Sequence, residues 1–222
     1  MENKKNIEKI MKILAKHYNF TERTTLNRMR KTKTSNSKAF KILISCLLSL
    51  RTQDKNTEIA SKRLFSVADI PEKIIKLPIK KLEKLIYSSG HYKKKARVLK
   101  HVSKELISRF NGKVPDNKEE LLSIKGIGPK TANIVLSFAY NQMVIPVDVH
   151  VHVIANRLGW ANTKKPEDTE KELEKIIPKK YWKELNGIFV LFGKEICITI
   201  SPWCSKCPVR EDCPRINVVR SR

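Results

Sequence analysis

The sequence predicts an all-α protein. Apolar residues recur at helical spacing in nearly every segment of the 222-residue chain, a pattern typical of amphipathic helices. Proline and glycine separate these segments into short pieces, which favours a bundle of helices over an alternating βα fold. One segment disagrees, because "VIPVDVHVHV" alternates apolar and polar residues as a strand does. Pro146 interrupts it and no neighbouring segment offers a pairing partner, so we do not predict a strand there.

Several helices are expected in the N-terminal half. An amphipathic helix comes first, with apolar residues at helical spacing from Ile7 to Tyr18. A basic connector at 30–38 then leads to an apolar run from Ala39 to Leu50, which we interpret as a buried core helix with Ser37 as its N-cap. Further helical patterns follow in "DKNTEIASKRLFSV", "PEKIIKL", "IKKLEKLIYSSG" and "YKKKARVLKHVSKELISRF".

The charge balance favours a polyanionic partner. The chain has 46 Lys and Arg residues against 22 Asp and Glu residues, which gives a formal net charge of +24 and a pI near 10.0. Lysines that neutralise phosphates release counterions, so nucleic acid is the leading partner, ahead of an anionic membrane surface. From charge alone, a lysine-rich surface that is merely solvated stays open as the alternative.

No targeting or membrane segment is visible in the sequence. Lys12 and Lys16 interrupt any signal-like run near the start. The run from Ala39 to Leu50 is too short to span a bilayer and contains Lys41. We therefore expect no membrane association and a cytoplasmic location, where reducing conditions disfavour disulfides between the five cysteines.

The stretch "IKGIGPKTAN" predicts two helices joined by a hairpin turn. Asp116 and Glu119 form a capping-box pattern for a short helix before it. Gly126 and Gly128 allow a tight turn with positive φ, and Pro129 suits the first position of the following helix. The N–H groups of such a turn, together with the positive end of the helix dipole, bind phosphate without reading base sequence. A plain glycine-rich connection between packed helices is the alternative.

Four cysteines near the end of the sequence indicate a metal site. Cys197, Cys204, Cys207 and Cys213 follow the order C-x6-C-x2-C-x5-C, and thiolates so close together bind a metal ion or a cluster. Their spacing allows structural zinc as well as a [4Fe-4S] cluster, and the ligand count favours neither. Cys46 stands apart in the predicted core helix and is interpreted as an inert buried residue.

Three of these motifs together resemble the endonuclease III family of helix-hairpin-helix DNA glycosylases. The hairpin, the segment "VDVHV" and the four-cysteine spacing occur in the family's order, and "LISCLLSLRTQD", "SGHYKKKA" and "LFGKEIC" extend the resemblance over almost the whole chain. It implies an all-α fold of two lobes. One is a six-helix barrel over residues 32–142, with the helix-hairpin-helix at about 116–141. The other is a helical lobe over 143–222 that includes the N-terminal helix (1–31), with a structural and DNA-docking [4Fe-4S] cluster at 197–213.

The resemblance also assigns catalytic roles to two residues. Lys130 stands where the family has its nucleophile, an amine that attacks C1′ of a damaged nucleotide, displaces the base and forms a Schiff base that leads to β-elimination. Asp148 corresponds to the family's carboxylate, which faces the lysine across the groove between the lobes and stabilises charge on the sugar. From the residues alone, Lys130 is one more surface lysine and Asp148 is the N-cap of a helix that starts near Val149. The capping and catalytic roles of Asp148 are compatible.

Other residues are expected to contact DNA. The segment "LSLRTQD" occupies the family's gap-filling position, where Arg51 replaces a frequent glutamine and Gln53 is close by. His91 occupies the opposing wedge position, which is commonly apolar in bacterial relatives. For the lysines at 93–95, the alternative is a basic face that is merely solvated. For His150, the alternative is a structural role near the start of a helix. The remaining expected contacts are Lys93, Lys94, Lys95, Gly126, Ile127, Gly128 and His150.

We therefore expect a base-excision-repair DNA glycosylase with AP-lyase activity on oxidised pyrimidines in damaged or abasic double-stranded DNA, monomeric and associated with the nucleoid. A mismatch-directed or purine-directed glycosylase of the same superfamily is the alternative enzyme. Lys130 disfavours it, because the monofunctional relatives carry another residue there. A non-catalytic DNA-binding protein or an iron-sulfur electron-transfer protein would not need Lys130 and Asp148 together.

Overall fold

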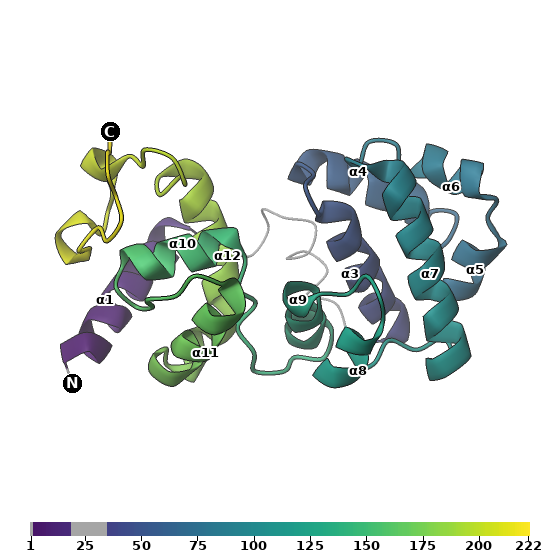
Figure 1. The fold of residues 1–222 in the computed structure, drawn as a ribbon, viewed down its shortest axis with the longest axis horizontal. Helices are drawn as coiled ribbons and strands as arrows, with labels where there is room; N and C mark the ends of the chain where they lie inside the picture. The colour runs from purple at the N-terminus through teal and green to yellow at the C-terminus, as the bar shows by residue number, and fades with distance from the viewer. Residues whose placement is uncertain (1, 19–34) are drawn as a thin grey trace. The chain divides into compact units, whose positions relative to one another are not determined.

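The computed structural model describes residues 2–18 and 35–222, with side chains from residue 5 onward. Within these residues every regular element is an α-helix or a short 3-10 helix, and no β-strand occurs (Figure 1). The all-α prediction is confirmed for this part of the chain. Most of the basic connector expected at 30–38 lies outside the described residues.

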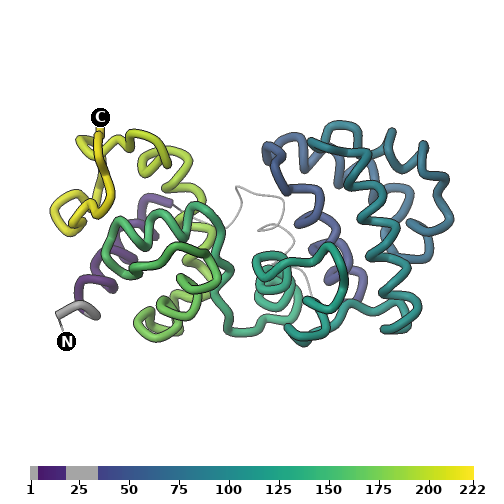
Figure 2. Tube along the Cα trace, in the orientation of Figure 1, coloured from purple at the N-terminus to yellow at the C-terminus, as the bar shows by residue number. Residues whose placement is uncertain are grey.

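The described residues divide into two compact units. Residues 2–18 pack with residues 143–222, and we call this part the terminal unit. Residues 35–142 form the central unit. The tube in Figure 2 shows how the purple N-terminal segment belongs with the green and yellow C-terminal segments.

The central unit is built around α3 (Asn36–Ser49), which packs against α4, α7 and α9. Its side chains are buried nearly all round, Phe40 and Leu43 completely, as expected of a core helix. The other helices of this unit are α4 (Asp54–Phe65), α5 (Pro71–Lys76), α6 (Ile79–Leu85), α7 (Tyr92–Phe110), α8 (Lys118–Ser123) and α9 (Pro129–Ala139).

Two predicted helix caps are displaced by one or two residues. Ser35, and not Ser37, caps α3, because its extended backbone lets the side chain accept a hydrogen bond from Lys38 N at 3.1 Å. Asn117, and not Asp116, caps α8, where its Oδ1 accepts from Glu120 N at 3.1 Å. Both helices start where a side-chain acceptor can reach an unpaired N–H group of the first turn.

The terminal unit places α1 (Glu2–His17) against α12 (Trp182–Glu195). The apolar face of α1 from Ile7 to Leu14 is buried, and each such side chain contributes about 1.5–3 kcal/mol relative to full exposure. The ring of Tyr18 lies 5.8 Å from that of Phe192 on α12. The other elements are α10 (Val149–Arg157), α11 (Pro166–Ile176), η1 (Lys179–Tyr181), η2 (Cys204–Lys206) and η3 (Arg210–Asp212).

The segment with strand-like alternation is irregular up to Asp148 and helical from Val149 onward. Capping by Asp148 starts a helix there, which explains why the period-two pattern does not form a strand. None of the described helices combines the length and the low polarity needed to cross a membrane.

Candidate functional site

The predicted hairpin joins α8 to α9 in the central unit. Gly126 has φ +106°, and a Cβ built there would lie 3.0 Å from Val98 Cγ1 on α7. Gly128 differs from the expectation of a positive φ, because its backbone is extended at φ −99°. A Cβ at Gly128 would meet nothing within 4 Å. Neither backbone strain nor packing requires glycine at 128, and its bare Cα leaves space for a ligand to approach the backbone.

Ile127 lies between these glycines and points inward. Its side chain is 5 % exposed, and its N–H donates to Ile124 O at 3.0 Å. The expected DNA contact by Ile127 is therefore wrong, because both the side chain and the N–H are used to close the turn and anchor it in the core.

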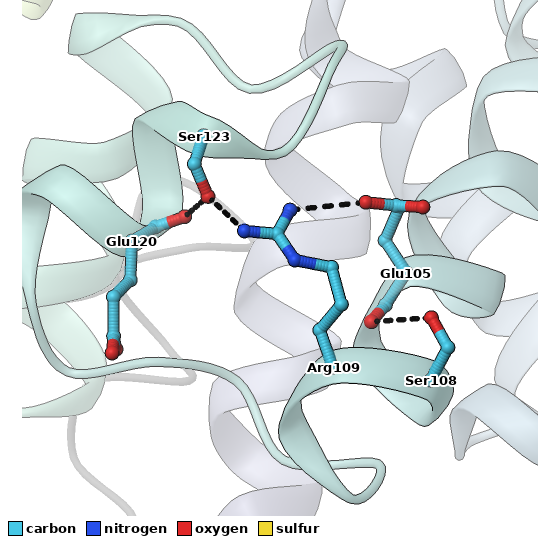
Figure 3. A network of polar contacts seen from close by, with 5 residues as sticks. All are labelled: Glu105, Ser108, Arg109, Glu120 and Ser123. Atoms are coloured by element: carbon cyan, nitrogen blue, oxygen red, sulfur yellow. Dashed lines mark hydrogen bonds and ion pairs between the residues drawn. The ribbon is translucent and has the colours of Figure 1, made fainter.

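The hairpin is also tied to α7 by a network of polar contacts (Figure 3). Arg109 Nη2 donates to Ser123 Oγ at 2.8 Å, and Ser123 Oγ donates to Glu120 O at 2.7 Å. Arg109 Nη1 pairs with Glu105 Oε2 at 3.0 Å on its own helix. A cation at the C-terminal end of α8 is also favoured by the helix dipole. The contacts hold the last turn of α8, and with it the start of the hairpin, in place.

Lys130 is the second residue of α9, directly after Pro129 at the first position. It is half-buried, and the first turn of α9 contains no acidic residue. The N–H groups at this end have no partner within the helix, so Lys130 belongs to the turn that carries the positive end of the dipole. Its charge also acts on Cys46 in α3, although burial is the larger influence and raises the pKa of that thiol to about 12. Cys46 is thus a buried thiol, as predicted.

Two loops of the central unit carry the predicted gap-filling and wedge residues. Arg51 follows α3, and His91 precedes α7. Both adopt the left-handed conformation, with φ 51° and 57°, which is uncommon for residues other than glycine and concentrates at functional sites. Gln53 is exposed at the N-cap of α4, where its carbonyl accepts from Thr57 N at 3.0 Å.

An open pocket of about 500 Å³ connects these loops with the hairpin. Its lining is partly aliphatic and partly cationic. The structure thus brings together five residues that the sequence assigned to DNA contact from separate segments. The expected contacts that do not line the pocket are Gln53, Lys93, Ile127, Gly128 and His150. The lining residues are Leu47, Leu50, Arg51, His91, Lys94, Lys95, Val98 and Gly126.

Lys95 requires a correction. Lys93 and Lys94 are exposed on the first turn of α7, as phosphate contacts must be. Lys95 is only 7 % exposed, and its ammonium donates to three protein oxygens. Burial lowers its pKa to about 8. A direct phosphate contact by Lys95 is therefore wrong, because its donors are occupied inside the protein.

In the terminal unit, Asp148 is the N-cap of α10, as predicted. Its Oδ1 accepts from Val151 N at 3.0 Å, and the residue is 9 % exposed. His150 packs against α12, where a Cβ built on Gly193 would lie 2.4 Å from His150 Nδ1. His152 Nδ1 lies 2.6 Å from Thr169 Oγ1 of α11. Both histidines therefore help to hold the helices around Asp148.

The four C-terminal cysteines are half-buried and line one cavity of the terminal unit. Burial raises the pKa of Cys197, Cys207 and Cys213, that of Cys207 to about 11. Across residues 5–18 and 35–222, no three His, Cys, Asp or Glu side chains close on a single point as ligands of one metal ion do. A zinc ion holds its thiolates at about 2.3 Å, whereas a four-iron cluster spreads four thiolates over four iron atoms. The four cysteines that line this cavity are the thiol donors that such a group needs.

Arg157 is a residue of this site that sequence analysis did not find. It is buried at the end of α10. Its guanidinium donates to Cys197 Sγ at 3.3 Å and to the carbonyls of Cys197, Ile198 and Thr199 at 3.2, 2.9 and 2.6 Å. No spacing signal marks it, because the contact joins segments 40 residues apart. A cation here favours the thiolate form of Cys197 and holds the loop that carries it.

Comparison with known proteins identifies relatives that share this sequence and this fold. Residues 44–179 match the model of the HhH-GPD superfamily base excision DNA repair protein. The chain is 45% identical over 174 residues to endonuclease III of Thermotoga maritima, covering 78% of this chain and 82% of that protein. It is also 34% identical over 212 residues to endonuclease III of Buchnera aphidicola, and this match covers 95% of this chain and 94% of that protein. A solved trapped covalent intermediate of endonuclease III with DNA, an estranged-adenine complex, superposes with a TM-score of 0.82 at 32% identity over 96% of each chain.

The matched family model spans both the hairpin and Asp148, and the structural similarity covers nearly the whole fold. The chain belongs to the endonuclease III family within the HhH-GPD superfamily of base excision DNA repair proteins.

Proposed function

We propose that this protein is a base-excision-repair DNA glycosylase that removes oxidised pyrimidines from duplex DNA and then cuts the strand through a Schiff base on Lys130. The observation that carries this proposal is the surface of the central unit. There a pocket lined by Arg51, His91 and Lys94 adjoins a hairpin with an open backbone at Gly128, directly before Lys130. Endonuclease III, which this chain resembles over 96% of its length, forms a trapped covalent intermediate with DNA.

The chemistry needs an amine at the sugar. The amine of Lys130 attacks C1′, the N-glycosidic bond breaks, and the base leaves with the bonding electrons and takes up a proton. The aminal opens to an iminium ion, which withdraws electrons from C2′. Loss of the C2′ proton then expels the 3′ phosphate and cuts the strand. The N-terminal end of α9 holds Lys130 where backbone N–H groups and the helix dipole also attract the phosphate next to the lesion.

Asp148 supports the same reaction as a carboxylate. Its Oδ1 is oriented by the Val151 N–H, so the group is preorganised and does not have to reorient during the reaction. A negative charge stabilises the cationic sugar as the base departs and helps to move protons in the later steps. The N-cap hydrogen bond is thus the device that positions the catalytic group.

Binding depends on charge and on backbone contacts. With a formal net charge of +24, the protein attracts duplex DNA over long range. Lys93 and Lys94 at the start of α7 contact phosphates, and Arg51 and His91 engage the space left when the damaged nucleotide leaves the stack. Lys95 is not among these contacts.

The C-terminal cavity holds a [4Fe-4S] cluster in this proposal, with Cys197, Cys204, Cys207 and Cys213 as ligands. When bound, the cluster supplies the covalent framework of the last segment, where few apolar side chains are available, and takes no part in the cleavage step. Arg157 orients the first ligand loop by its donors to Cys197, Ile198 and Thr199. We also propose that the protein acts as a cytoplasmic, nucleoid-associated monomer.

Borohydride trapping on a duplex that contains thymine glycol or an abasic site tests the proposal. The wild-type protein should form a covalent adduct and cut the strand, and Lys130→Gln should do neither while keeping most of its DNA affinity, because one lysine changes the salt dependence by only about one unit. Lys94→Gln is the matched control. It should weaken binding and still trap at saturating protein. Trapping and cleavage by Lys130→Gln at the wild-type level would refute the assignment of the nucleophile.

A further inference from the structure

Two loops of the central unit are joined into one structure. Loop A (50–53) connects α3 to α4, and loop B (86–91) connects α6 to α7. Gly90 N in loop B donates to Thr52 Oγ1 in loop A at 3.0 Å. A Cβ built on Gly90 would lie 2.8 Å from the carbonyl oxygen of Arg51. The two backbones are thus in direct contact beside Arg51 and His91.

The Lys95 side chain reaches from α7 into this junction. Its ammonium donates to Leu48 O at 2.7 Å, to Thr52 Oγ1 at 2.8 Å and to Ser89 Oγ at 2.8 Å. An ammonium has three N–H donors, and each has one acceptor here. One side chain therefore binds the end of α3, loop A and loop B at once.

The partners of Lys95 are themselves satisfied. Thr52 Oγ1 donates to Leu50 O at 3.2 Å and accepts from both Gly90 N and Lys95 Nζ. Ser89 Oγ donates to Leu48 O at 2.8 Å and accepts from Lys95. A hydroxyl has one donor and two acceptor positions, so Thr52 uses all of its capacity. A fully connected buried network of this kind rigidifies the segments it joins.

A gain in folding stability does not by itself explain why the Lys95 ammonium is buried here. The three acceptors of Lys95 are uncharged oxygens, and removing an ammonium from water is costly when no opposite charge compensates it. Even a buried ion pair can often be replaced by apolar side chains of similar volume without loss of stability, so a buried charge is weak evidence for a gain in stability. The network has a better explanation in the conformation of the two loops, since left-handed residues such as Arg51 and His91 persist only where their surroundings hold them.

We propose that Lys95 is a positioning residue that fixes loops A and B as one rigid edge, so that Arg51 and His91 face the pocket before DNA arrives. This inference rests on the proposed function, because it assigns the edge a role in engaging the distorted duplex. An edge already held in its binding conformation avoids the ordering cost when it enters the gap beside an extruded nucleotide. Lys95 acts through the two loops and contacts no DNA.

A comparison of Lys95→Met with Lys94→Met tests this role. Both variants lose one positive charge on neighbouring residues, and both are assayed with a duplex that carries a tetrahydrofuran abasic-site analogue and with the same duplex undamaged. Lys94→Met should weaken binding to both duplexes in similar proportion. Lys95→Met should lower the preference for the abasic duplex by about tenfold, leave affinity for undamaged DNA within about twofold, and unfold at the same or a higher temperature.

A second variant removes the junction without changing the charge. Thr52→Val deletes the hydroxyl that accepts from Lys95 and Gly90. It should also lower the preference for the abasic duplex and speed hydrogen exchange at the Gly90 amide. This variant decides the question if Lys95→Met does not fold.

Two outcomes separate this inference from the proposed function. If the wild-type protein does not prefer the abasic duplex and does not trap, the proposed function fails. If the wild-type protein does both, while Lys95→Met or a folded Thr52→Val keeps the full preference for the abasic duplex, the positioning role of Lys95 is refuted.

Discussion

The two hairpin glycines should respond in opposite ways to the same substitution. Gly126→Ala places a Cβ 3.0 Å from Val98 Cγ1 at φ +106°, a conformation that costs a non-glycine residue about 1–3 kcal/mol. Taking about 2 kcal/mol, a chain of this size should lose roughly 4–8 °C in Tm. Gly128→Ala has φ −99° and meets no atom within 4 Å, so its stability should be unchanged or higher by about 0.4–1 kcal/mol, because alanine restricts the unfolded chain.

For DNA affinity the order of the two variants should be reversed, with Gly128→Ala more strongly affected than Gly126→Ala. Its added methyl group stands on the open side of the hairpin, where a phosphate would approach the backbone N–H groups of α9. We expect Gly128→Ala to weaken binding to an abasic duplex by about tenfold, equivalent to about 1.4 kcal/mol for a lost charge-assisted contact. Gly126→Ala should bind more weakly only in proportion to the fraction of protein that is unfolded or distorted.

The assay pairs thermal unfolding with a binding titration for each variant at one fixed salt concentration, because phosphate contacts depend on salt. A Gly128→Ala protein with wild-type affinity would show that the open face at Gly128 does not receive DNA. A Gly126→Ala protein with wild-type Tm would show that the turn adapts without strain, contrary to its geometry.

Two further predictions concern the terminal unit. Asp148→Asn should keep the N-cap, because asparagine caps as well as aspartate, and yet slow base removal in single-turnover assays; Asp148→Ala should lose about 1 kcal/mol of stability as well. Equal single-turnover rates for Asp148→Asn and the wild type would restrict Asp148 to capping. Arg157→Gln should lower the iron content and the absorbance at about 400 nm of the purified protein, because the Cys197 loop loses its donors. The exposed Arg220→Gln serves as the control, and an unchanged iron content in Arg157→Gln would remove Arg157 from the cluster site.

The sequence by itself determined the features that depend on short-range pattern. Apolar spacing gave the helical class, because an amphipathic helix repeats every 3.6 residues whatever it packs against. The hairpin was recognisable since Pro129 starts its second helix and Gly126 permits the positive φ of the turn. The Asp148 cap could be predicted for the same reason, since its acceptor reaches an N–H group only three residues away.

Only the tertiary structure decided which of several equivalent residues has which role. Lys93, Lys94 and Lys95 are identical in sequence, but successive residues of a helix point in directions about 100° apart, and α7 turns Lys95 into the protein beneath the two loops. Gly126 and Gly128 are equally permissive as residues, and the position of Val98 makes only the first sterically necessary. The contact of Arg157 with Cys197 followed the same rule. It depends on a donor and an acceptor that lie 40 residues apart in the chain and meet only in space, and no local pattern in the sequence records that distance.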